Sequence, residues 1–64
     1  MYKTYDKFLA LMDAIAYDYY HGNVISATIG FDTLVDLGRQ CVAAGINETV
    51  VQMHITETYS ILWG

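Results

Sequence analysis

The spacing of apolar side chains between residues 4 and 21 predicts an amphipathic helix. Apolar residues recur every three or four positions, which gathers them on a stripe about 120° wide, because each helical residue turns the chain by ~100°. Thr4 is placed to cap the start of this helix and Gly22 to end it. The stripe consists of Tyr5, Phe8, Leu9, Met12, Ile15, Ala16 and Tyr19.

Residues 23 to 30 change to a period of two, which is typical of a half-buried strand. One face of such a strand holds Ile25, Ala27, Ile29 and Phe31. Serine, threonine and glycine occupy the positions between them, so the opposite face is small or polar. We therefore expect a strand to follow the first helix.

Helical spacing returns in residues 33 to 44, which predicts a second helix. Asp32 stands before it as an N-cap, and Gly45 with Ile46 fits a Schellman ending, in which a left-handed glycine is followed by an apolar contact. The inner stripe of this helix consists of Leu34, Leu37, Gly38, Cys41 and Val42.

The most regular alternation lies within residues 49 to 63, and only Glu57 breaks its odd-numbered apolar series. The apolar residues at odd positions are Val51, Met53, Ile55, Tyr59, Ile61 and Trp63, and the polar residues at even positions are Gln52, His54, Thr56, Thr58 and Ser60. One interpretation is a single strand of about fourteen residues, some 46 Å long at ~3.3 Å per residue and bent at Glu57. The other is a hairpin with residues 56 to 58 at its tip. We favour the long strand because the tip lacks Gly, Asn, Asp and Pro.

These elements predict a small two-layer α/β (α+β) domain with the order α-β-α-β, or α-β-α-ββ if the last strand folds back as a hairpin. A right-handed crossover would place both helices on one face of a small sheet. We expect residues 1 to 64 to form one compact domain, since a chain of this length holds one domain at most.

Composition adds the expectation of a homodimer. Hydrophobic residues make up 55% of the chain and charged residues 16%, whereas an average domain has about 25% charged residues. One copy therefore has more apolar side chains than its interior can hide. Pairing of the overhanging last strand with its counterpart in a second copy predicts a two-fold interface that buries Ile55, Tyr59, Ile61 and Trp63.

Charge and cysteine content exclude several classes of protein. Seven acidic and three basic residues give a net charge of −4, so we expect no direct binding to nucleic acid. No run of about 18 apolar residues is present, so we expect no membrane span. Cys41 is the only cysteine, which rules out an internal disulfide and fits the cytoplasm, or the host cytoplasm if the chain is phage-encoded.

Few residues offer catalytic or metal-binding chemistry. Cys41 lies on the inner stripe of the second predicted helix and is interpreted as a core residue. Asp18 and His21 have the helical spacing of a metal pair, but a histidine near a helix C-terminus also interacts favourably with the helix dipole. His54 falls on the polar face of the last predicted strand. We therefore predict no catalytic residues, no metal and no cofactor.

The tyrosines are the strongest candidates for a binding surface. Tyr17 and Tyr20 fall outside the buried stripe of the first helix, on a flank that they share with Asp6 and Asp13. Tyrosine is enriched at protein interfaces because it combines a large apolar ring with a hydrogen-bonding end. Tyrosines beside carboxylates predict binding to a basic or arginine-rich partner, although they could instead pack on a second copy or cover a sheet edge.

We therefore expect a non-catalytic binding protein that inhibits or modulates a larger partner. Small acidic phage-encoded inhibitors of host systems, such as anti-CRISPR proteins, are an analogy in size and charge. The alternative is a small dimeric regulatory or assembly subunit of the antitoxin type. A third hypothesis is a small-ligand sensor or enzyme that uses His21 and His54 in a pocket between subunits.

Overall fold

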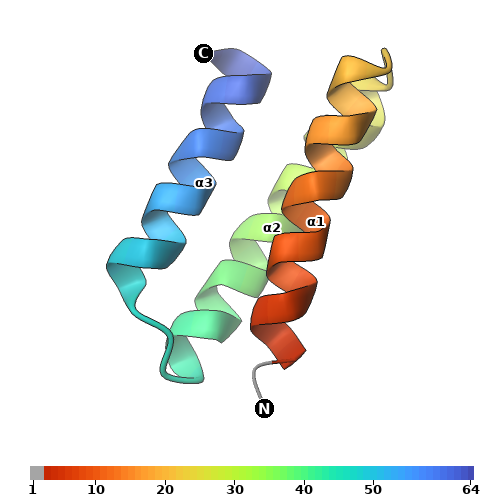
Figure 1. The fold of residues 1–64 in the computed structure, drawn as a ribbon. Helices are drawn as coiled ribbons and strands as arrows, with labels where there is room; N and C mark the ends of the chain where they lie inside the picture. The colour runs from red at the N-terminus through yellow and green to blue at the C-terminus, as the bar shows by residue number, and fades with distance from the viewer. Residues whose placement is uncertain (1–2) are drawn as a thin grey trace.

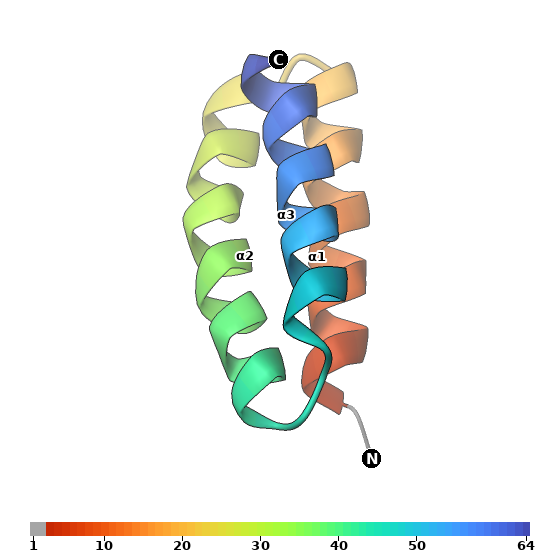
Figure 2. The same ribbon diagram turned by 90° about the vertical axis from the view of Figure 1, so that its left-hand side faces the viewer.

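The structure, a computed structural model that describes residues 3–64, consists of three α-helices joined by short connections (Figure 1). They are α1 (Lys3–Tyr20), α2 (Val24–Ala43) and α3 (Glu48–Trp63), and no strand is present among the described residues. Consecutive helices run in opposite directions, and α3 lies over the seam between α1 and α2 (Figure 2). The α/β fold class predicted from the sequence is therefore wrong: this is an all-helical domain.

The predicted strand over residues 23 to 30 is instead the first part of α2. A helical stripe of buried and half-buried residues runs without a break from this segment into the predicted second helix. Ile25 and Ile29, which the strand interpretation placed on the buried face, point outward and are 79% and 64% exposed. Asp32 lies inside the helix rather than at its N-cap. The stripe consists of Ala27, Phe31, Leu34, Gly38 and Cys41.

The C-terminal segment is one helix, so both the long strand and the hairpin are wrong. Its inward positions are Val51, Ile55, Thr58 and Leu62, at intervals of four, three and four residues. Thr58 hides this spacing in the sequence because it is polar, yet it is almost fully buried. Its hydroxyl donates a hydrogen bond of 2.9 Å to the His54 carbonyl one turn earlier, which removes the cost of an unpaired polar group in the core.

Both turns contain a glycine with a positive φ, which is 85° at Gly22. The first predicted helix is confirmed within one residue at each end, although Thr4 lies inside α1 and is not its N-cap. The Schellman ending of α2 is also confirmed. The Ile46 N–H donates to the Cys41 carbonyl at 3.0 Å, and Gly45 has the positive φ of 105° that this ending requires. The side chain of Asn47 then caps α3 by accepting a hydrogen bond from the Thr49 N–H.

The core runs along the axis between the three helices. Cys41 is fully buried in it, as the sequence predicts, and this burial raises the pKa of its thiol. Close packing of α2 and α3 depends on Gly38, where an added Cβ would lie 3.0 Å from side-chain carbons of Val51 and Ile55. The fully buried apolar side chains are Phe8, Ile15, Ala27, Leu34, Cys41 and Val51.

Candidate interaction surfaces

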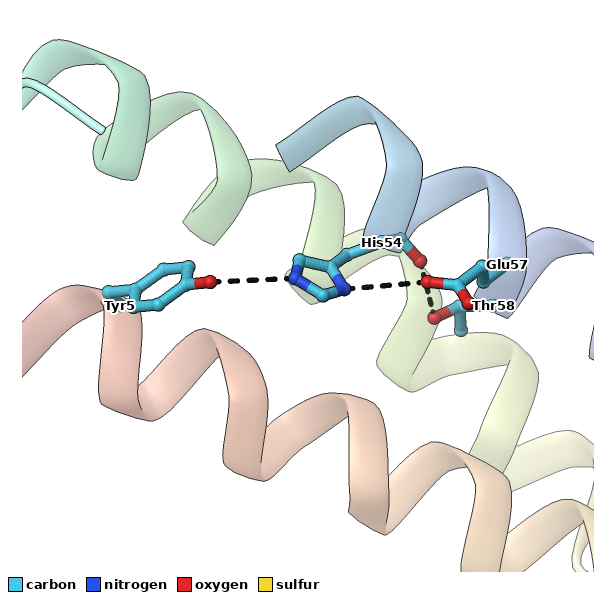
Figure 3. A network of polar contacts seen from close by, with 4 residues as sticks. All are labelled: Tyr5, His54, Glu57 and Thr58. Carbon is cyan, nitrogen blue, oxygen red and sulfur yellow. Dashed lines mark hydrogen bonds and ion pairs between the residues drawn. The ribbon is translucent and has the colours of Figure 1, made fainter. Parts of the chain in front are cut away.

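His54 is the centre of a polar network between α1 and α3 (Figure 3). Its Nε2 lies 3.4 Å from the Tyr5 hydroxyl, and its Nδ1 lies 3.5 Å from a carboxylate oxygen of Glu57. The Phe8 ring meets the imidazole edge-on at 6.1 Å. The imidazole is therefore half-buried between two helices, rather than solvated on the polar face of a strand as the sequence interpretation placed it.

This network has the composition of a proton relay but not its geometry. The His54 Nδ1 is buried and makes no hydrogen bond, because the Glu57 contact is at the limit of hydrogen-bonding distance. The hydroxyl of Thr58 contacts the backbone carbonyl of His54 and not its ring. The two surface hollows described below are lined by other residues. These contacts are those of a side chain that holds α3 against α1.

The other histidine lies near the opposite end of the bundle. His21 follows the last turn of α1, its Nδ1 donates to the Tyr17 carbonyl at 2.8 Å, and Asp18 instead accepts a hydrogen bond from the Ser26 hydroxyl. His54 contacts Tyr5, near the start of α1. Tyr5 and His21 are sixteen residues apart, which corresponds to about 24 Å along the helix axis at ~1.5 Å per residue. The two histidines therefore share no site within one chain.

Residues 3–64 contain neither a cluster of metal-binding side chains nor a helix that could span a membrane. No group of three or more His, Cys, Asp and Glu side chains in this part of the chain is arranged to hold a metal ion. None of the three helices is both long and apolar enough to cross a bilayer.

The four residues predicted to bind a partner lie together on the outer face of α1. Asp6, Asp13, Tyr17 and Tyr20 are all exposed, at intervals of seven, four and three residues, which places them in one row. The row is about 21 Å long at ~1.5 Å per residue. We refer to these four residues as the α1 ridge.

Both ridge tyrosines are held in place by neighbouring rings. The Tyr17 ring stacks on the His21 imidazole with 3.9 Å between ring centres, and Tyr20 meets Tyr19 edge-on at 5.5 Å. The two tyrosine side chains are nevertheless 62% and 71% exposed. They are thus large apolar groups that each contact one neighbouring ring and contribute little to the core.

Of the four residues predicted to form a dimer interface, two meet in an exposed aromatic cluster. Tyr59 and Trp63 pack on each other at 5.1 Å and on Phe31 of α2 at 6.1 and 5.3 Å. Ile55 lies one turn before Tyr59 on the same side of α3, half-buried against the core. Ile61 lies on the other side of the helix, because two residues correspond to about 200° of rotation. We refer to Phe31, Tyr59 and Trp63 as the aromatic cluster.

A hollow of about 300 Å³ opens between α2 and α3 at the end away from the aromatic cluster. Gly38 and Val51 line its inner part, and Arg39 and Glu48 bring charges to its lining. The sequence interpretation missed this hollow because it assigned the two segments to a helix and a strand. The spacing of Val51, Ile55 and Leu62 was the available signal for a helix here. We call this the Gly38 hollow, lined by Val35, Gly38, Arg39, Val42, Glu48, Val51, Gln52 and Ile55.

A second, wider hollow of about 560 Å³ lies at the start of α2. Val24, Ile25 and Ile29 supply its large apolar side chains, and all three are exposed. It contains no charged residue.

Comparisons with protein-family models, with curated proteins and with solved structures found no match for this chain.

Proposed function

We propose that this is a non-catalytic binding protein that attaches to a larger protein through the α1 ridge and thereby inhibits or modulates it. One observation carries the proposal: two largely exposed tyrosines are held by neighbouring rings in the same row as two exposed carboxylates. Rigid aromatic groups lose little conformational entropy on binding, so they are efficient anchors of an interface.

The charge of the ridge favours a basic partner surface. Asp6 and Asp13 can each accept paired hydrogen bonds from an arginine guanidinium, and the faces of Tyr17 and Tyr20 can stack on the same cations. The net charge of −4 adds a long-range attraction toward a positive surface. An arginine-rich protein surface can pair with the carboxylates of the ridge and stack on its tyrosine rings at the same time.

The histidines favour binding over catalysis. His54 is engaged with Tyr5 and Phe8 between two helices, and His21 is stacked on Tyr17 and bonded to its carbonyl. Both imidazoles thus have roles in supporting other parts of the chain. His21 in addition fixes one ridge tyrosine, which connects it to the proposed binding surface.

Affinity capture with matched variants tests the proposal. The double variant Tyr17→Ser/Tyr20→Ser is compared with Met53→Ser, since Met53 is 61% exposed on α3, away from the ridge. A partner retained by the wild type and by Met53→Ser should be lost from the double variant. Two interface anchors contribute at least about 2 kcal/mol, which corresponds to roughly thirty-fold in affinity.

Two further measurements separate binding from folding. The double variant should melt within about 2 °C of the wild type, because exposed side chains contribute little to stability. Binding of the wild type should weaken as salt is raised, since the carboxylates face cations. A double variant that unfolds would show that the two tyrosines support the fold. A partner held equally well by all three folded proteins would show that the ridge is not the binding surface.

A further inference from the structure

α3 contributes less to the core than either of the other helices. In α3, described over Glu48–Trp63, Val51 is the only apolar side chain that is fully buried. Ile55 and Leu62 are half-buried, and the other fully buried residue is the polar Thr58. The contact between α1 and α2 is the most extensive in the bundle, and the contact between α1 and α3 is the smallest. The α1/α2 pair is therefore the main body of the molecule, and α3 covers it from one side (Figure 2).

Polar contacts hold α3 only loosely against α1. The Tyr5 hydroxyl lies 3.4 Å from the His54 Nε2, which is at the limit of hydrogen-bonding distance, and the buried Nδ1 of His54 makes no hydrogen bond (Figure 3). Within residues 3–64, this is the only side-chain hydrogen bond between α3 and another helix. By contrast, the Ser26 hydroxyl of α2 donates to the Asp18 carboxylate of α1 at 3.0 Å. Hydrogen bonding therefore favours the α1/α2 contact over the α1/α3 contact.

The packing of α3 on α2 is close at one point and open around it. An added Cβ at Gly38 would lie 3.0 Å from side-chain carbons of Val51 and Ile55, so the two helices touch there. The Gly38 hollow of about 300 Å³ opens beside this contact. Farther along, the aromatic cluster joins the helices through rings of which Tyr59 and Trp63 are about half exposed. Apolar contacts that remain open to water stabilise a helix less than buried contacts do.

The composition of α3 makes its helix dependent on these contacts. Seven of its 16 residues are β-branched, and β-branched side chains lose rotamer freedom in a helix. A helix of this length is marginal in water without tertiary packing. Detachment of α3 from the other helices is therefore coupled to the loss of its helical structure. The β-branched residues are Thr49, Val50, Val51, Ile55, Thr56, Thr58 and Ile61.

We propose that α3 is a detachable strap, which opens as a unit while the α1/α2 pair keeps its helices. The hinge of this movement is Asn47, because Ile46 is bonded to the Cys41 carbonyl of α2 and the next helix begins directly after Asn47. Segments with few buried contacts open in this way below the free energy of global unfolding. Phe8 and Cys41 belong to the same buried cluster as Val51 of α3, so the open form presents an apolar surface that the closed form hides.

Opening of α3 leaves the α1 ridge intact. The rings that contact the ridge tyrosines are those of Tyr19 and His21, which lie on α1 and directly after it. Neither ring contacts α3, since the aromatic pairs that involve α3 contain other residues. The detachable strap and the partner-binding ridge are therefore independent properties of the chain, and each can be tested without the other.

Native-state hydrogen exchange tests the opening helix by helix. The backbone amides of α3 should be at least about tenfold less protected than the best-protected amides of α1 and α2, because they exchange without global unfolding. Equal protection of the best-protected amides in all three helices would show that the bundle opens only as a whole, and would overturn the proposal.

Chemical labelling of the Cys41 thiol measures the same opening at a single atom. Cys41 is the only cysteine and is fully buried, so a soluble disulfide reagent reaches it only after the core opens. Thr56→Ala, at an exposed position of α3, raises the helix propensity of α3 and should slow labelling about two-fold. Thr33→Ala is the matched control on α2, and should leave the rate unchanged because α2 is helical in both forms.

Two results of the labelling experiment would overturn the proposal. If Thr33→Ala slows labelling as much as Thr56→Ala does, Cys41 is uncovered only by global unfolding. If neither substitution changes the rate, the reagent reaches Cys41 without the release of α3.

Discussion

At the end of the bundle where α2 passes into α3, large side chains meet in the core and a side-chain cap holds the next helix. At the other end, where α1 turns into α2 (Figure 1), the buried residues include a small alanine and a polar threonine, and several large apolar side chains are exposed. We call these the packed end and the exposed end. The packed end has Phe8, Cys41 and Val51 in its core, and the exposed end has Ile15, Ala27 and Thr58.

The exposed end contains most of the large apolar side chains that the fold leaves uncovered. They include both ridge tyrosines, the apolar residues of the wide hollow on α2 and two members of the aromatic cluster. The packed end can therefore stabilise the fold, while the exposed side chains of the other end remain available for binding. The residues are Tyr17, Tyr20, Val24, Ile25, Ile29, Tyr59 and Trp63.

The largest effect on this comparison should come from Phe8, the bulkiest side chain of the packed end. Phe8→Ala removes a fully buried ring that touches the His54 and Gly38 regions, and should lower the free energy of unfolding by ~3–5 kcal/mol. Urea denaturation followed by circular dichroism measures this loss. If Phe8→Ala lowered the free energy of unfolding by less than Tyr17→Ala does at the exposed end, the assignment of the two ends would be reversed.

Asn47 and Asn23 stand at the N-caps of α3 and α2, so they allow helix capping to be compared between the two ends of the bundle. The Asn47 side chain accepts a hydrogen bond from the Thr49 N–H at 2.8 Å, whereas the Asn23 side chain makes no such bond at the start of α2. Asn47→Ala should therefore cost about 1 kcal/mol of stability. Asn23→Ala should cost much less, and equal losses in thermal unfolding would contradict the difference in capping.

The buried hydroxyl of Thr58 should prove nearly dispensable for stability. Thr58→Val keeps the shape of the side chain and removes a donor whose acceptor, the His54 carbonyl, belongs to a helix ladder. The change in unfolding free energy should stay within about 1 kcal/mol, because donor and desolvation cost are lost together. Thr58→Ala serves as the control: it opens a cavity and should be clearly more destabilising than Thr58→Val.

The smallest effect should come from the outer face of α2 at the exposed end. Ile25→Gln and Ile29→Gln alter side chains that are largely exposed, so each should change the unfolding free energy by no more than about 0.5 kcal/mol. Glutamine also has a slightly higher helix propensity than isoleucine. Destabilisation by more than 1 kcal/mol, measured by thermal unfolding, would mean that these residues are covered in solution.

The sequence predicted which residues share a face more accurately on α1 than on α3, for a geometric reason. Residues 4 to 21 had the correct period, so Asp6, Asp13, Tyr17 and Tyr20 were assigned to one exposed face. Residues 49 to 63 were assigned the two-residue period of a strand, although they form a helix. Residues four apart share a side in both a strand and a helix, which kept Tyr59 and Trp63 together. Residues two apart do so only in a strand, which is why Ile61 was misplaced.

Two local features misled the interpretation of α2 and α3. The alternation from Ile25 to Phe31 is present in the sequence. The segment is nevertheless helical, because the buried stripe that includes Ala27 continues through Leu34 at helical spacing. In α3, the polar residue Thr58 occupied an inward position and interrupted the apolar stripe. The period-two pattern therefore appeared stronger than the helical pattern in both segments.

The sequence by itself determined the first helix, both glycine-ended turns, the burial of Cys41 and the outward row of acids and tyrosines, because each depends on neighbours within a few residues. The tertiary structure decided that the segments at 24–31 and 48–63 are helical. It also decided that α2 and α3 enclose a groove with aromatic rings at one end and a hollow at the other. Those outcomes depend on packing between distant segments: Gly38 admits Val51 and Ile55, and the third helix covers a core that two helices alone would leave open.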